Sequence, residues 1–256
     1  MLRRVIFFAY GLGTCCALAI VLFAGCGPLP ATASIPPPVQ EVPAEIKAVI
    51  ADRASVEVKP DDPLYALPAD KVVDDLTNLD GCWAGWTVLT SPADFLLIRQ
   101  GQAIADMYDY VRFDAPTRQF VRQGYGRNLI GPFAVDTYTA ERGTYTVTAS
   151  NRVAFTTQAM TVANPMTGRV FTLPDELDAY LADVASSEGG IDAGDLESMR
   201  AGMLEEFTNP QPWENLVTIQ GDRLKLTDVW YDEETGAEVV DTENARICVR
   251  FPSPEM

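Results

Sequence analysis

The stretch Thr144-Tyr145-Thr146-Val147-Thr148-Ala149 decides the fold class, because polar and apolar residues alternate along it. A period of two places every second side chain on one face of a strand that is buried on one side. The same alternation recurs at 133–137, 153–157 and 224–226, and turn-forming residues separate the runs. These turns are Glu141-Arg142-Gly143, Ser150-Asn151, Asn164-Pro165-Met166-Thr167-Gly168, Gln220-Gly221-Asp222 and Asp232-Glu233-Glu234-Thr235-Gly236. Their spacing is typical of hairpins and predicts a mainly β domain of eight to ten antiparallel strands between Cys82 and Phe251.

One block departs from this pattern and has helical periodicity. Leu177, Tyr180, Leu181 and Val184 fall on one helical face, as do residues further along between 196 and 207. Glu188-Gly189-Gly190 separates the two stretches. We predict a helical hairpin at about 174–208, inserted between strands, which either forms a lid over the mouth of a barrel or covers an open sheet edge.

The N-terminus has the layout of a secretory signal. Arg3 and Arg4 precede an uncharged, apolar run that extends to Gly25. An uncleaved membrane helix is the alternative, because a run of this length can span a bilayer. The segment Leu22-Phe23-Ala24-Gly25-Cys26 resembles the bacterial lipobox, in which small residues precede a cysteine that is acylated before cleavage. The resemblance implies that residues 1–25 are a signal peptide and that Cys26 becomes the lipidated first residue.

This resemblance also carries expectations about location and domain organisation. The lipid would anchor the protein to a membrane of the cell envelope, facing the periplasm or the exterior. Gly27 is not the aspartate that retains many such proteins at the inner membrane, which favours the outer membrane. Residues 26–67 are rich in proline and are predicted to be a tether with a possible short helix at 44–54. Residues 68–256, beginning with a second short helix at 68–75, are predicted to form the folded domain.

Charge and composition exclude several functions. The net charge is −17, and it becomes −19 once residues 1–25, which hold Arg3 and Arg4 but no acidic residue, are removed. Such a surface repels nucleic acid and anionic lipid, so attachment to a membrane is expected to be covalent. The chain contains no histidine, which removes the usual general base and the commonest zinc ligand. We therefore predict a non-enzymatic protein with no catalytic residues, no metal and no cofactor.

Acidic residues offer two further patterns. Asp106, Asp109 and Asp114 lie along one predicted strand, where they suggest either the acid pair of a hydrolase or an acidic solvent face. The segment from Asp192 to Glu197 lacks the ligand spacing of a calcium loop, so we expect Asp192 or Asp195 to cap a helix instead.

The opening of the strand region, Leu79-Asp80-Gly81-Cys82-Trp83-Ala84-Gly85, resembles the Gly-x-Trp motif of lipocalins and lipocalin-like domains. The segment 218–227 is similar to the penultimate hairpin of bacterial lipocalin-like lipoproteins. The resemblance implies an antiparallel up-and-down barrel in which Gly81 and Trp83 close one end. A late arginine, Arg246 or Arg250, would pack across the tryptophan.

Closure of such a barrel has a consequence for the two cysteines of the domain. The first and last strands of a closed barrel are neighbours, so we predict a disulfide between Cys82 and Cys248. The alternative is two buried, unpaired thiols.

The resemblance further implies a barrel that binds a small, largely apolar ligand. Aromatic residues are available either to line its cavity or to fill its core, at positions 86, 108, 110, 120, 125, 138, 145, 155 and 230. The competing interpretation is a structural or assembly adaptor of the envelope with a filled barrel and an unidentified protein partner.

Overall fold

The computed structural model describes residues 42–59, 61–68, 76–90, 103–130, 133–164, 167–188, 191–232, 235–242 and 245–252. The predicted signal peptide, Cys26 and the first part of the tether lie outside these residues. So does almost all of the helix predicted at 68–75.

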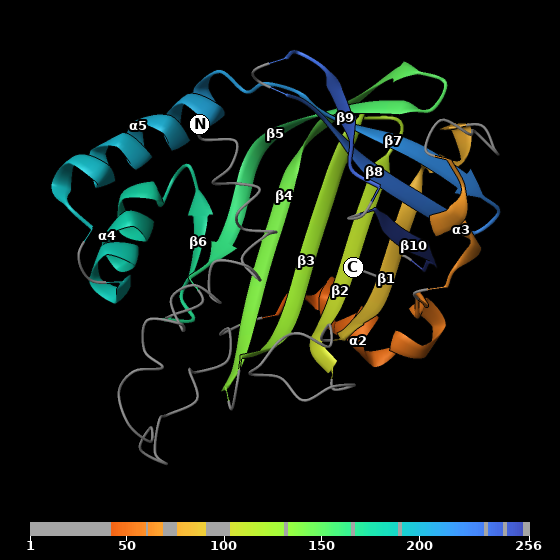
Figure 1. Ribbon diagram of the computed structural model, residues 1–256, viewed down its shortest axis with the longest axis horizontal. Helices are drawn as coiled ribbons and strands as arrows, with labels where there is room; N and C mark the ends of the chain where they lie inside the picture. Colours follow the sequence, from red (N-terminus) through yellow and green to blue (C-terminus); the bar gives the residue numbers. More distant parts are fainter. Residues whose placement is uncertain are drawn as a thin grey trace.

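Ten antiparallel strands make up one sheet, as the alternating pattern predicted (Figure 1). The first five are long and consecutive, and the last five surround and follow the helical insertion. Their bounds are β1 (Gly81–Thr90), β2 (Ala103–Asp114), β3 (Gln119–Ile130), β4 (Phe133–Ala149), β5 (Arg152–Ala163), β6 (Val170–Leu173), β7 (Trp213–Gln220), β8 (Arg223–Tyr231), β9 (Glu238–Val240) and β10 (Arg246–Phe251).

Eight of these strands close into a barrel. The pairing runs β10–β1–β2–β3–β4–β5–β7–β8, and β8 pairs with β10 to complete the circle. The short strands β6 and β9 extend the sheet outside this circle, on β5 and β8 respectively. The prediction of a closed up-and-down antiparallel barrel is therefore confirmed.

The seam between the first and last strands depends on a glycine. Trp83 pairs with Arg250 and Ala84 with Val249, which brings the next residue, Gly85, against the backbone of β10. A Cβ atom on Gly85 would lie only 2.6 Å from the carbonyl oxygen of Ile247. A residue without a side chain is needed here because β1 and β10 approach so closely.

The predicted Cys82–Cys248 disulfide is absent, although the strands that carry the two residues are paired. Cys82 lies opposite Phe251 in the register, three positions from Cys248, and the two side chains belong to different clusters on opposite faces of the sheet. Both thiols are free and buried. Strand adjacency was thus predicted correctly, but a disulfide also needs matching register and face.

One half of the barrel interior is a solid apolar core. Phe113 meets Tyr145 edge-on with ring centroids 5.3 Å apart, and Phe120 meets Phe155 in the same way at 5.0 Å. Aliphatic side chains of β7, β8 and β10 complete this cluster together with Trp83. The barrel is therefore closed at this end by packed side chains rather than open as a channel.

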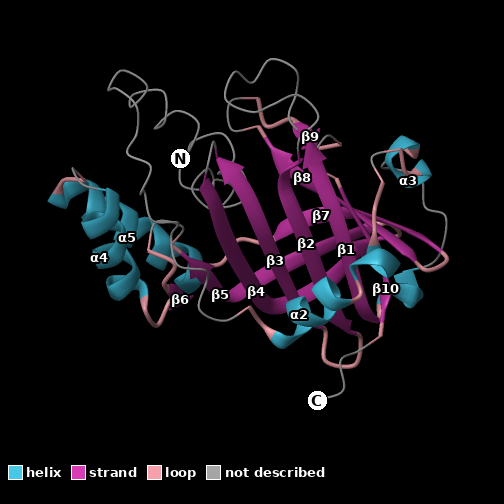
Figure 2. Ribbon diagram, turned by 90° about the horizontal axis from the view of Figure 1, so that it is seen from below, coloured by secondary structure: helices cyan, strands magenta, loops and turns pink. Residues whose placement is uncertain are grey.

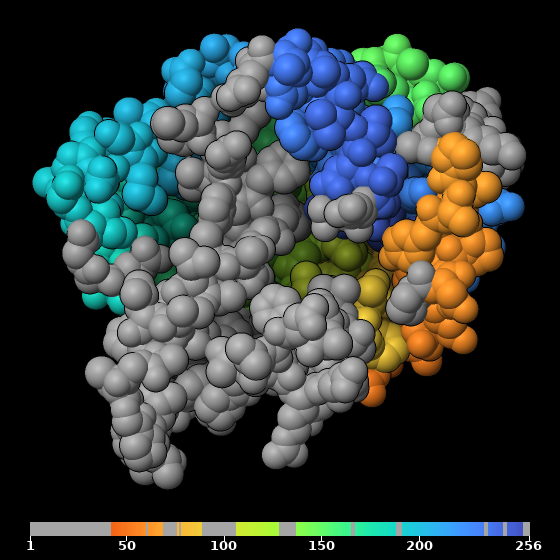
Figure 3. Space-filling view, viewed as in Figure 1, coloured from red at the N-terminus to blue at the C-terminus, as the bar shows by residue number. Residues whose placement is uncertain are grey.

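A segment before the barrel covers part of its outer surface. It contains α2 (Ala44–Ala51), the 3-10 helix η1 (Arg53–Val56) and α3 (Pro63–Ala66), and we call residues 42–59 and 61–67 the outer wrap. Figure 2 shows α2 lying across the outside of the first strands, and Figure 3 shows the wrap in orange at the margin of the molecule opposite the teal helices. Ile46 and Val49 are fully buried, so the described residues of the predicted tether pack against the barrel instead of extending away from it.

Lys225 and an ion pair between Asp62 and Arg223 hold the wrap to the barrel. Lys225 of β8 is 1% exposed and its Nζ donates hydrogen bonds to the carbonyl oxygens of Leu64, Tyr65 and Leu67, at 2.9 to 3.4 Å. Burial lowers the pKa of this lysine. Asp62 forms an ion pair with Arg223 and also accepts a hydrogen bond from the backbone of Leu64 at the start of α3.

The helical hairpin lies where predicted, as α4 (Leu177–Glu188) and α5 (Ala193–Thr208). Met160, Phe171, Leu181 and Met203 are among the residues that join it to β5 and β6 in one apolar cluster. The side chain of Asp192 caps α5 by accepting a hydrogen bond from the backbone N–H of Asp195 at 2.8 Å, as the sequence suggested.

Candidate functional site

The closed end of the barrel is built around Trp83 and Arg250. The indole of Trp83 is fully buried and donates a hydrogen bond to the carbonyl oxygen of Leu79, at 2.9 Å. The Arg250 guanidinium lies 4.2 Å from the Trp83 ring centroid. It also donates to the carbonyl oxygens of Asp80 and Asn78, at 2.9 and 2.7 Å, which ties β10 to the segment before β1.

The second arginine of the predicted motif lies elsewhere. Arg246 is four residues earlier on β10 and lines a cavity rather than the Trp83 ring. Its guanidinium is 3.7 Å from the carboxylate of Asp228. Gly81 has a φ of +109°, a backbone conformation that favours glycine, and a Cβ there would lie 3.1 Å from the Arg250 guanidinium.

A cavity of about 700 Å³ lies next to the solid core, and Trp213 borders both. It forms because β5 pairs with β7 only from Arg152 to Phe155, after which β5 pairs with β6 instead. The C-terminal end of α5 and the connection from Asn209 to Pro212 border the resulting opening. The hairpin therefore forms one wall of the cavity. This position is similar to that of a lid over the barrel mouth, which was one of its two predicted roles.

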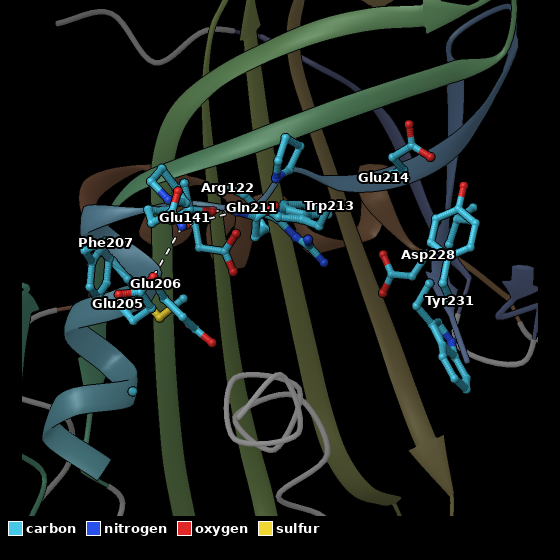
Figure 4. Close-up of a pocket in the computed structure, with 18 of the residues that line it drawn as sticks. Arg122, Glu141, Glu205, Glu206, Phe207, Gln211, Trp213, Glu214, Asp228 and Tyr231 are labelled. Carbon is cyan, nitrogen blue, oxygen red and sulfur yellow. Dashed lines mark hydrogen bonds between the residues drawn. The ribbon is translucent and has the colours of Figure 1, made fainter. Parts of the chain in front are cut away.

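Aromatic side chains supply much of the apolar lining. Phe207 comes from the end of α5, Trp213 from the start of β7, and Trp230 and Tyr231 from the end of β8. Figure 4 shows Phe207 with Glu205 and Glu206 on one side of the cavity, Tyr231 with Asp228 on the other and Trp213 between them. Trp230 and Tyr231 are 38% and 49% exposed, so the cavity has apolar surface that water reaches.

Trp213 is held rigidly between two partners. It stacks on Phe155 with ring centroids 4.4 Å apart. The guanidinium of Arg122, on β3, lies 5.2 Å from the centroid of the Trp213 ring. Its indole nitrogen donates to the hydroxyl of Thr157 at 3.2 Å. The tryptophan thus forms a fixed floor between the aromatic core and the cavity.

Charged groups lie inside the barrel at the level of Trp213. Arg122 and Glu141 are directly opposite each other on β3 and β4, and each is 5% exposed. Asp109 is nearby on β2, flanked across the strands by Gly85 and Gly124. Burial raises the pKa of Asp109 from 3.8 to about 6, and the positive charge of Arg122 offsets part of this effect. The pKa of this carboxyl is therefore higher than that of an exposed aspartate.

A second polar chain lies across the cavity on β7, β8 and β10. The side-chain amide of Asn215 donates to the carboxylate of Asp228 at 2.6 Å, and Asp228 in turn faces Arg246. Asn215 is fully buried, and its side-chain oxygen accepts no hydrogen bond from any described group. The interior therefore combines an apolar wall with fixed charges and a buried acceptor.

The aromatic residues considered from sequence divide into three groups. Trp230 lines the cavity, while Phe120, Tyr145 and Phe155 fill the core. The remaining five lie on the outer face of the sheet, in the cluster that α2 covers; these are Trp86, Tyr108, Tyr110, Tyr125 and Tyr138.

The three aspartates of β2 are not brought together. Asp109 points into the barrel, whereas Asp106 accepts a hydrogen bond from the indole of Trp86 at 3.3 Å and Asp114 accepts one from the backbone of Thr117 at the following turn. The inward-facing polar residues Arg122, Glu141 and Asn215 were missed by sequence reasoning. Their signal was a charged or amide residue at a position where the alternation places an inward side chain.

Comparisons of the chain with models of known protein families, with curated proteins and with solved structures find no match. Among the described residues, no group of three or more cysteine, aspartate or glutamate side chains is arranged to hold a metal ion. None of the helices in the described part has both the length and the apolar character needed to cross a bilayer.

Proposed function

We propose that this protein is a membrane-tethered, lipocalin-like barrel that holds a small, largely apolar ligand and catalyses no reaction. The observation that carries the proposal is the cavity of about 700 Å³ beside the core. Ligand sites in proteins typically enclose 300–1,000 Å³ and combine an apolar lining with a few fixed polar groups. An adaptor with a completely filled barrel would have no such space.

The arrangement of the two ends supports the same proposal. Trp83 and Arg250 seal one end, and the core beneath Trp213 is packed solid. Among the described residues, the opening through which a ligand would enter is the one where β5 and β7 separate, beside α5. Trp230 and Tyr231 at this opening offer an apolar surface to an entering molecule.

Tethering is proposed from the N-terminal sequence. Acylation of Cys26 would anchor the barrel to an envelope membrane, and metabolic labelling with a radioactive fatty acid tests it. Wild-type protein is expected to incorporate label, and a Cys26→Ser variant to incorporate none. Equal labelling of both proteins would contradict the assignment of Cys26.

Ligand binding is tested by native mass spectrometry of the full chain purified from its own host. We expect a bound small molecule in the wild-type protein. Gly202 lines the cavity from α5, so Gly202→Leu places a side chain in the space and also improves helix propensity. Ala201→Leu, at an exposed neighbouring position outside the lining, is the matched control.

The expected result is loss of the bound molecule in Gly202→Leu and its retention in Ala201→Leu. Empty wild-type protein, or the same occupancy in both variants, would contradict a ligand in this cavity.

A further inference from the structure

We infer that the ligand is an organic cation: an apolar body that carries a protonated amine. The inference rests on the proposed function, because it names the chemistry of the molecule held in that cavity. Two features of the site lead to it, namely the charges of the lining and the aromatic groups at the opening.

The lining of the cavity is acidic. Among the described residues, five carboxylates and two guanidinium groups contribute to it. Arg152, outside the lining, pairs with Glu214 at 2.7 Å, which still leaves two negative charges in excess. The carboxylates are Glu141, Glu205, Glu206, Glu214 and Asp228, and the guanidinium groups are Arg122 and Arg246. In a partly desolvated site an anionic ligand would be repelled by this excess, and a cation attracted.

The second feature is the aromatic character of the opening. Trp230 and Tyr231 are both substantially exposed and lie on the strand that carries Asp228. Aromatic faces attract organic cations, and a nearby carboxylate strengthens the attraction. A protonated amine with an apolar body therefore matches each element of the lining.

The test uses three probes of equal size and different charge: phenylbutylamine, phenylbutanoic acid and phenylbutanol. Their binding to the full chain in phospholipid nanodiscs is measured at neutral pH by isothermal titration calorimetry, with empty nanodiscs as the blank. We expect the amine to bind about tenfold more tightly than the carboxylate, with the alcohol between them, and the difference to shrink in high salt.

A double variant locates the effect. Glu205→Gln with Glu206→Gln removes two charges at the end of α5 and is expected to reduce the preference for the amine to about threefold. Glu197→Gln, exposed on the same helix and outside the cavity lining, is the matched control and is expected to leave the preference unchanged.

The outcomes separate this inference from the function on which it rests. Equal binding of all three probes, or tighter binding of the carboxylate, would overturn the cationic ligand while leaving the binding barrel in place. If none of the probes binds and the host-purified protein is also empty, the binding function itself is contradicted. Amine binding that is insensitive to Glu205 and Glu206 would also overturn the inference as stated.

Discussion

Replacing Asp109 with asparagine is expected to stabilise the protein at neutral pH and to have almost no effect in acid. The carboxyl lies inside the barrel between Gly85 and Gly124, neither of which offers a polar side chain to it. Arg122 supplies the favourable charge, but burial is the larger effect. An asparagine has nearly the same shape and carries no charge to desolvate.

The magnitude follows from the pKa of Asp109. It rises from 3.8 to about 6 in the folded protein, and one pKa unit corresponds to about 1.4 kcal/mol. The folded state therefore binds the proton more tightly than the unfolded state, so the ionised carboxylate lowers stability above pH 6. The free energy of unfolding of the wild-type protein should rise by up to about 3 kcal/mol relative to that of Asp109→Asn as the pH falls from 6 to 3.8.

The assay is urea unfolding of both proteins at a series of pH values across this window. Because the other titrating groups are common to both proteins, their contributions cancel in the difference. The matched control is Asp106→Asn, which makes the same substitution on the opposite face of the same strand. A stability difference for Asp109→Asn that is constant with pH, or that grows in acid, would refute the buried-carboxyl interpretation.

Three other predictions concern the framework of the barrel. Gly85→Ala is expected to lower the free energy of unfolding by about 1–3 kcal/mol, measured by thermal unfolding, because the added Cβ collides with the Ile247 carbonyl at the β1–β10 seam. Unchanged stability would mean that the seam is more open. Arg250→Met should lower the free energy of unfolding by about 2 kcal/mol in the same assay, since it removes the contact over Trp83 and two hydrogen bonds. Lys225→Met should release the outer wrap and expose it to limited proteolysis, and a wrap that stays resistant would show that apolar packing alone holds it.

The sequence predicted the strands well because most inward and outward positions alternate cleanly. It did not reveal which face of β2 points inward. Val111 and Phe113 face the core, while Tyr108 and Tyr110 are equally buried under α2. When a helix covers the outside of a barrel, both faces of a strand are apolar. The alternation of residue types then no longer shows which face points inward.

The outer wrap was hidden for a related reason. Its prolines suggested a tether, yet Ile46, Val49 and Val56 provide enough apolar surface to dock on the barrel. Docking depends on a partner surface that is formed by distant strands, so local composition does not reveal it. The disulfide prediction was wrong for a similar reason. The register of the β1–β10 pairing is set along the whole of both strands and not by the two cysteines.

The cavity is the feature that the account most depends on, and a crystal structure of the full chain, isolated from its own host without added ligand, tests it most directly. We expect continuous non-protein electron density between Trp213, Trp230 and the end of α5, beside the acidic groups of the lining. Side chains that close together and fill this space, with β5 and β7 paired along their full length, would contradict a ligand-holding barrel.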